Sequence, residues 1–143
     1  MARYFLNIGT DWGNTANWSD TDGGAGGFSV PTAADDVFFT ALSGNCTVNV
    51  IDRQCKNFVC TGYASTLTMT FSIAVFGNTL TLSAAMTISG SGGLAPSASM
   101  TLTSNGKAWP NQINFTFQTA TFTFADDWTV GRVRTIGAAN IFN

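Results

Sequence analysis

Carboxylates are the side chains of this sequence with the most obvious capacity for chemistry. Two pairs are adjacent, Asp35-Asp36 and Asp126-Asp127, and paired carboxylates are the catalytic groups of glycosidases. Adjacent residues of an extended strand point to opposite faces, which separates the members of each pair. Asp35-Asp36 also follows a Pro-containing turn and precedes an apolar strand. We therefore interpret both pairs as turn caps rather than catalytic groups.

Histidine is absent from the sequence, which excludes Ser-His-Asp and Cys-His catalysis and any zinc site that needs His. The three cysteines, Cys46, Cys55 and Cys60, are a weak metal set and an odd number for a disulfide framework. Cys55 and Cys60 are five residues apart, so in one strand they would lie on opposite faces. We predict reduced, small core residues. A disulfide between Cys46 and one of the other two remains an alternative.

Oxygen ligands for calcium could come from the N-terminal region, where Asp11, Asp20 and Asp22 lie near Asn14 and Asn17. Their spacing does not match the calcium-binding loop of an EF-hand. Side chains of this kind commonly cap loops as Asx turns, which is the interpretation we adopt. The sequence thus predicts no catalytic residue, no metal site and no cofactor.

The composition is apolar and poor in charge: 45% of residues are hydrophobic and 10% are charged, with a net charge of −2. There is neither the basic footprint of a nucleic-acid-binding protein nor a polybasic patch for anionic lipid. The first residues lack the apolar run of a signal peptide, and no later stretch is as long and apolar as a membrane span. We expect synthesis in the cytoplasm, no nucleic-acid partner and no membrane insertion.

Short segments in which apolar residues alternate with Thr or Ser fill the middle of the chain. A period of two is typical of half-buried β-strands, and Gly- and Asn-rich turns separate these segments. Residues 86–92 and 100–106 resemble each other at an interval of fourteen residues, which suggests stacked coils. The prediction is an all-β fold, a short right-handed parallel β-solenoid with an N-terminal cap. An antiparallel β-sandwich or jelly roll is the alternative. The alternating segments include Thr66–Phe71, Thr79–Leu82, Met86–Ile88, Met100–Thr103, Phe115–Phe117 and Thr121–Phe124.

Two regions divide what we expect to be one structural domain. Residues 1–40 are predicted to form the cap and the first strand, and residues 41–143 the coils. A first coil exposes its core and a strand edge, which large apolar side chains can cover. The candidate cap residues are Trp12, Trp18 and Phe28, and the candidate core residues include Phe71, Leu82, Ile88, Leu102 and Phe117.

Between Asn57 and Ala125 there is one charged residue, Lys107. In a solenoid, side chains of neighbouring coils stack in ladders, which Thr tolerates and like charges do not. Coverage by neighbouring subunits would equally remove the need for charge.

Several segments together resemble β-helical repeat proteins of phage virions, either tail-fibre or virion-associated proteins, and of bacterial surface adhesins. The resemblance begins with Asn17-Trp18-Ser19 and Val30–Val37 and continues through a cysteine-bearing strand and three later segments. It implies a role in display or attachment and supplies no catalytic residue. The cysteine-bearing strand is Cys55–Gly62, and the three later segments are Leu80–Ser83, Leu102–Lys107 and Phe122–Val130.

The function we expect is that of a non-enzymatic, virion-associated structural protein, a capsid decoration or tail-fibre-like protein, that acts by assembly and display. Its partners would be copies of itself and other virion or surface proteins, and its location the virion or an extracellular surface. The alternative is a glycan-binding adhesin module with a host glycan as partner. Trp109, Trp128 and Tyr63 lie near predicted turns, so they are candidates for glycan or subunit contact.

Overall fold

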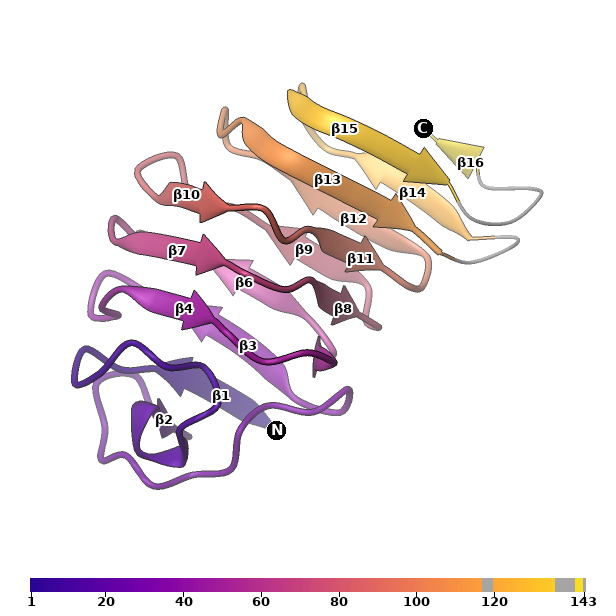
Figure 1. Cartoon of the computed structure of the whole chain (residues 1–143). Coiled ribbons are helices and arrows are strands. Elements are labelled where there is room, and N and C mark those ends of the chain that lie inside the picture. The colour runs from indigo at the N-terminus through magenta and orange to yellow at the C-terminus, as the bar shows by residue number, and fades with distance from the viewer. Residues whose placement is uncertain (117–119, 136–140, 143) are drawn as a thin grey trace.

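The computed structural model describes residues 1–116, 120–135 and 141–142 of the chain. These residues form a β-solenoid of about five coils, in which three sheets run along one axis (Figure 1). In Figure 1 the strands of two sheets cross the front from left to right. The strands of the third sheet return behind them as the chain climbs, so the coil is right-handed. The parallel solenoid is thereby confirmed over the antiparallel sandwich.

Sheet A has eight strands in the order β16-β14-β12-β9-β6-β3-β1-β2. Adjacent strands of sheet A are parallel, except that β1 and β2 are antiparallel. Its strands are β1 (Ala2–Phe5), β2 (Trp18–Ser19), β3 (Asp36–Phe39), β6 (Phe58–Cys60), β9 (Thr79–Thr81), β12 (Met100–Thr103), β14 (Thr121–Phe124) and β16 (Ile141–Phe142).

Sheets B and C together form the opposite side of the solenoid, and both are parallel. Sheet B contains β4 (Cys46–Val48), β7 (Thr66–Met69) and β10 (Thr87–Gly90). Sheet C contains β5 (Arg53–Cys55), β8 (Ile73–Val75), β11 (Leu94–Pro96), β13 (Trp109–Phe115) and β15 (Val130–Thr135).

One coil takes 21 or 22 residues, as the register of sheet A shows. Val37 pairs with Phe58, which pairs with Leu80, which pairs with Leu102. The fourteen-residue interval suggested by the sequence is therefore not the coil length. Residues 87–90 are β10 of sheet B and residues 100–103 are β12 of sheet A, and these strands do not pair.

The core consists of columns of inward-facing side chains that run along the solenoid axis. Cross-strand neighbours in parallel sheets are about 4.8 Å apart, so apolar side chains in one column pack directly on one another. Each fully buried Leu or Phe contributes about 1.5–3 kcal/mol relative to exposure. Sheet A supplies Val37, Phe58, Leu80 and Leu102, and sheet C supplies Ile73, Leu94 and Ile113, all 0% exposed.

Polar side chains at the corners join one coil to the next. Each accepts a hydrogen bond of 2.8–3.0 Å from a backbone N–H that lies 21 or 22 residues away in the chain. Short strands leave many corner N–H groups without a ladder partner, and these side chains supply the missing acceptors. They are Asn45, Asn57, Ser72, Ser99 and Asp126.

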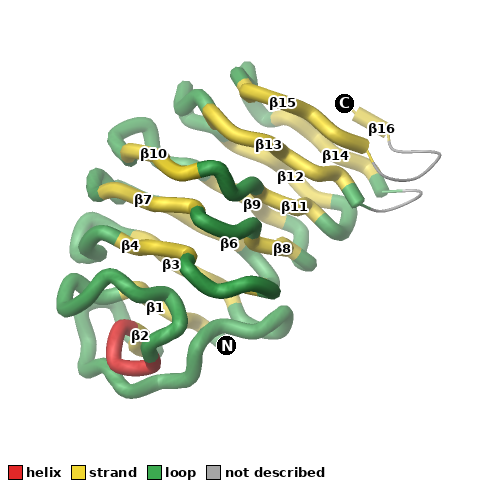
Figure 2. Tube along the Cα trace, in the orientation of Figure 1, coloured by secondary structure: helices red, strands yellow, loops and turns green. Residues whose placement is uncertain are grey.

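A cap closes the N-terminal end of the solenoid (Figure 2), where the one helical turn of the described residues, η1 (Thr15–Asn17), lies beside β2. Trp12 and Trp18 are fully buried there, with ring centroids 4.9 Å apart. The Trp18 indole N–H donates to the Trp12 carbonyl at 2.7 Å. Phe28 is partly buried against the same core. The cap residues proposed from the sequence thus lie at this end of the core.

Among the candidate core residues, Leu82 and Leu102 are fully buried and Ile88 is partly buried. The prediction for Phe71 is wrong, because its side chain is 38% exposed. β7 ends at Met69, and the bend that follows turns Phe71 outward. Phe117 lies outside the described residues.

Candidate binding groove on sheet C

A shallow groove of about 290 Å³ lies on the outer surface of sheet C, near its N-terminal edge. Three segments from successive coils form it: the bend that leads into β5 together with β5, the bend between β7 and β8 together with β8, and β11. Its lining comprises Ile51, Asp52, Arg53, Gln54, Phe71, Ser72, Ala74 and Ala95.

Small side chains form the floor of the groove. Gln54, Ala74 and Ala95 are aligned in neighbouring strands. Ile73 and Val75, on either side of Ala74, are fully buried in the core, so this column lies on the outer face of sheet C. Alanine methyl groups cover the backbone without rising above it. The surface is therefore recessed along Ala74 and Ala95, and bulkier side chains beside them form the walls of the groove.

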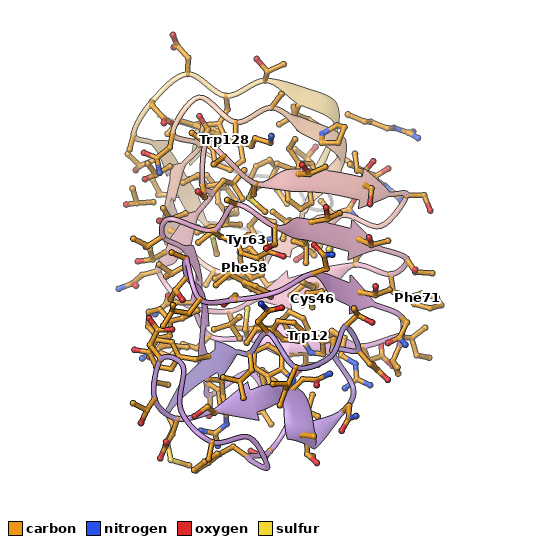
Figure 3. The ribbon with its side chains drawn as sticks, turned by 90° about the vertical axis from the view of Figure 1, so that its left-hand side faces the viewer. Trp12, Cys46, Phe58, Tyr63, Phe71 and Trp128 are labelled. Carbon is orange, nitrogen blue, oxygen red and sulfur yellow. The ribbon has the colours of Figure 1, made fainter. Side chains whose placement is uncertain are left out.

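Phe71 and Ile51 are the apolar walls, 38% and 60% exposed. Phe71 projects away from the solenoid, whereas Trp12, Cys46, Phe58 and Tyr63 point into its interior (Figure 3). The backbone N–H of Phe71 donates to the carbonyl of Val48 at 3.1 Å, which fixes the bend.

The polar groups of the groove are only partly used by the fold. The Ser72 hydroxyl oxygen accepts from the Gly93 N–H at 3.0 Å. In the described part of the chain, the carboxylate of Asp52 and the amide of Gln54 have no hydrogen-bond partner. Asp52 has a φ of 58°, a left-handed backbone conformation that is uncommon for a residue other than glycine.

One member of each carboxylate pair, Asp35 and Asp126, is a turn cap in the structure, whereas Asp36 begins β3 and accepts from the Asn57 amide. Asp35 is 5% exposed and accepts hydrogen bonds from the N–H and the hydroxyl of Thr32, at 3.0 and 2.7 Å. Burial raises the pKa of Asp35, but the hydrogen bonds from Thr32, the N-terminal ammonium group 3.2 Å away and the charge of Arg3 together outweigh burial, so the pKa lies below its ordinary value. Asp126 accepts from the N–H groups of Ser104 and Asn105, which lower its pKa.

The proposed oxygen ligands of the N-terminal region serve the loops individually. Asp11 accepts from the Gly13 N–H at 2.7 Å, and Asn14 accepts from the Ala16 N–H at 3.0 Å. Asp22 accepts from the Thr40 hydroxyl, and the Asn17 amide donates to a carbonyl. The ranges 1–116, 120–135 and 141–142 contain no cluster of three or more Cys or Asp side chains that could hold a metal ion.

The three cysteines belong to one coil, with Cys46 on sheet B, Cys55 on sheet C and Cys60 on sheet A. All are buried and none is bonded to another. Burial raises the pKa of each thiol well above its ordinary value. A buried neutral thiol is a poor nucleophile and a poor metal ligand, so these residues act as core packing.

Two of the aromatic residues suggested for glycan or subunit contact are not at the surface. Trp109 and Tyr63 are both 0% exposed, so neither can stack on a glycan or touch a subunit. The Tyr63 hydroxyl lies 2.9 Å from the Thr66 carbonyl and 3.1 Å from the Gly44 carbonyl. Trp128 is partly buried and packs edge-on against Phe124, with ring centroids 6.1 Å apart.

Threonine side chains form a regular array on the outer face of sheet A. Thr79, Thr101 and Thr123 are aligned in one column, and Thr81 and Thr103 in a second. The hydroxyls of the four residues other than Thr79 have no hydrogen-bond partner among the described residues. We call these five residues the threonine face.

Sequence reasoning missed the groove because its key residues lie in bends. The segment Val50–Gln54 carries neither an alternating pattern nor a motif. The charged pair Asp52-Arg53, which lies between Cys46 and Cys55, was a signal in the sequence that could have indicated an exposed polar site.

The fold and groove define a capped, right-handed parallel β-solenoid with a concave surface on one face. No protein-family profile, curated protein or solved structure matches the chain. No helix within the described ranges is long and apolar enough to cross a membrane.

Proposed function

We propose that this chain is a non-enzymatic structural protein of a virion, a capsid decoration or tail-fibre-like protein, that acts by assembly and display. The observation that carries the proposal is the threonine face. It spans three adjacent strands of sheet A, β9, β12 and β14, and contains no charged residue.

The chemistry of the threonine face suits contact between copies of the chain. Charged residues are depleted at the centre of protein interfaces, because each would have to lose its water. Threonine presents a methyl group for packing and a hydroxyl that both donates and accepts. Two such faces are self-complementary, as a symmetric dimer interface requires.

The remainder of the fold suits display. Columns of buried side chains and polar corner bonds tie every coil to the next, so the solenoid behaves as a stiff body. The N-terminal cap pairs with β4 through backbone hydrogen bonds between Thr47 and both Thr10 and Trp12, which covers a strand edge that would otherwise recruit further chains. The resemblance to β-helical repeat proteins of virions supports the location on a virion or an extracellular surface.

Size-exclusion chromatography with light scattering tests the assembly. One chain has a mass of 15.1 kDa, and we expect a multiple of this mass at high protein concentration. The association should be insensitive to added salt, because the threonine face carries no charge to screen. A monomer at every concentration would contradict the proposal.

Glycan binding by an adhesin module is the second candidate, and the groove on sheet C favours it. A glycan array separates the two roles, because an assembly protein without a recognition function gives no saturable signal. Assembly and binding could also coexist, since the threonine face and the groove lie on different sheets.

A further inference from the structure

We propose that the groove on sheet C is a binding site for one ring of a neutral sugar. The inference rests on the glycan-binding candidate and assigns it a site and a ligand class. It does not depend on assembly, because every residue involved belongs to sheet C or its bends.

Phe71 provides the apolar surface that a sugar ring requires. One face of a pyranose ring presents C–H groups, which pack against aromatic rings. Phe71 is 38% exposed beside a floor formed by the methyl groups of Ala74 and Ala95. A ring that entered the groove would therefore contact apolar atoms both on its side and beneath it.

Asp52 and Gln54 provide the hydrogen bonds. A carboxylate has two oxygens and can accept from two neighbouring hydroxyls, and an amide both donates and accepts. Neither side chain has a partner within the described residues. Backbone strain that no internal contact explains is frequent at binding sites. Asp52 adopts such a conformation, with its φ of 58°.

The charge and size of the groove define the ligand class. Asp52 and Arg53 contribute opposite charges to the lining, so the groove has no net charge with which to attract an acidic or a basic sugar. Its volume, about 290 Å³, is at the lower limit of small-molecule sites. One ring with few contacts implies a dissociation constant on the order of 1 mM, which several copies on one particle would strengthen by avidity.

Saturation-transfer difference NMR on the intact chain measures such weak binding. The neutral probes are the methyl glycosides of glucose, galactose, mannose and N-acetylglucosamine, and methyl glucuronide is the acidic comparison. We expect saturable transfer to at least one of them. Phe71→Ala should weaken binding at least about tenfold, because it removes the stacking surface. Asp52→Asn should weaken it severalfold, because one oxygen acceptor is lost.

Phe76→Ala is the matched control, since Phe76 is also 38% exposed but does not line the groove. It should bind as the unaltered chain does. The inference is overturned by absence of transfer to every neutral probe, by binding of methyl glucuronide alone, or by equal loss of binding in Phe71→Ala and Phe76→Ala.

Light scattering on the same samples separates the two proposals. A chain that assembles without binding sugar contradicts only this inference, and a monomer that binds sugar contradicts only the assembly.

Discussion

The carboxylate of Asp126 accepts a hydrogen bond from the backbone N–H of Ser104, 2.8 Å away, and so joins two corners that are 22 residues apart. The same carboxylate accepts from the N–H of Asn105. An aspartate that could have belonged to a catalytic pair instead supports the turn of the preceding coil. The same use of polar side chains recurs along the solenoid, at Asn45, Asn57, Ser72 and Ser99.

Asn57→Ala should destabilise the fold by about 1–2 kcal/mol. The Asn57 side-chain oxygen accepts from the N–H groups of Asn78 and Thr79, at 2.9 and 3.0 Å, and its amide donates to Asp36 at 2.7 Å. Alanine leaves those N–H groups without their acceptor. Urea unfolding followed by circular dichroism measures the change. Asn78→Ala, at an exposed position of the same corner, should change stability by less than about 0.5 kcal/mol. Equal losses in both variants would contradict the role of Asn57.

Asp35 should make the stability of the cap depend on pH. Its pKa is lowered in the folded state, whereas an unfolded aspartate has a pKa of about 3.9. The ionised carboxylate therefore stabilises the fold above about pH 4, and this contribution is lost as the pH falls through the folded-state value.

Thermal unfolding between about pH 2 and pH 7 tests this expectation. Asp35→Asn should have a lower melting temperature than the unaltered chain at pH 7, and the difference should shrink in acid. The control is Asp20→Asn, because within the described residues the exposed Asp20 accepts only from the hydroxyl of neighbouring Thr21. If the difference in melting temperature between Asp35→Asn and the unaltered chain stayed constant with pH, the charge of Asp35 would not be the source of its stabilising effect.

The cysteines should report unfolding of the first complete coil. Cys46, Cys55 and Cys60 are buried, and their pKa values are raised, so few thiolates form in the folded chain. A thiol reagent such as Ellman's reagent at about pH 8 should react with all three in guanidinium chloride and with none at a comparable rate in buffer. Rapid labelling of one thiol in the folded chain would contradict the packing of this coil.

Asp52→Gly should separate stability from sugar binding. Glycine adopts a φ of 58° without strain, but it adds freedom to the unfolded chain, so stability should change by less than about 1 kcal/mol. The carboxylate is lost, so binding of neutral methyl glycosides should weaken as it does in Asp52→Asn. Melting temperature and saturation transfer, measured on one preparation, test both parts. A large destabilisation would mean that the Asp52 side chain supports the fold.

The strand pattern made the solenoid predictable, because alternation of apolar residues with Thr survives in β7, β9, β12 and β14. The coil length was not predictable from the sequence. Equivalent core positions in successive coils can hold any apolar residue, so no recognisable sequence repeat marks the interval of 21 or 22 residues. Val37, Phe58 and Leu80 occupy one column without resembling one another. Strands β10 and β12 resemble each other although they belong to different sheets.

The position of the groove and the burial of Tyr63 and Trp109 are set by bends of the chain. The alternation of apolar and polar residues predicts strands but does not predict where a bend turns a side chain. Phe71 continues the pattern of Leu67 and Met69, but the strand has ended and the side chain turns outward. Tyr63 and Trp109 lie near turns and yet point inward, where they fill corners of the core. A residue's face at a corner is set by the coils above and below it, which local sequence does not encode.

Charge on the threonine face tests the central claim most directly, because the claim is that this face joins copies of the chain. Thr101→Lys with Thr103→Lys adds two like charges to adjacent positions of the face, whereas Thr87→Lys adds one on the exposed outer side of sheet B. Light scattering should give a multiple of 15.1 kDa for the unaltered chain and for Thr87→Lys, and 15.1 kDa for the double variant. Equal masses for all three chains would contradict the account.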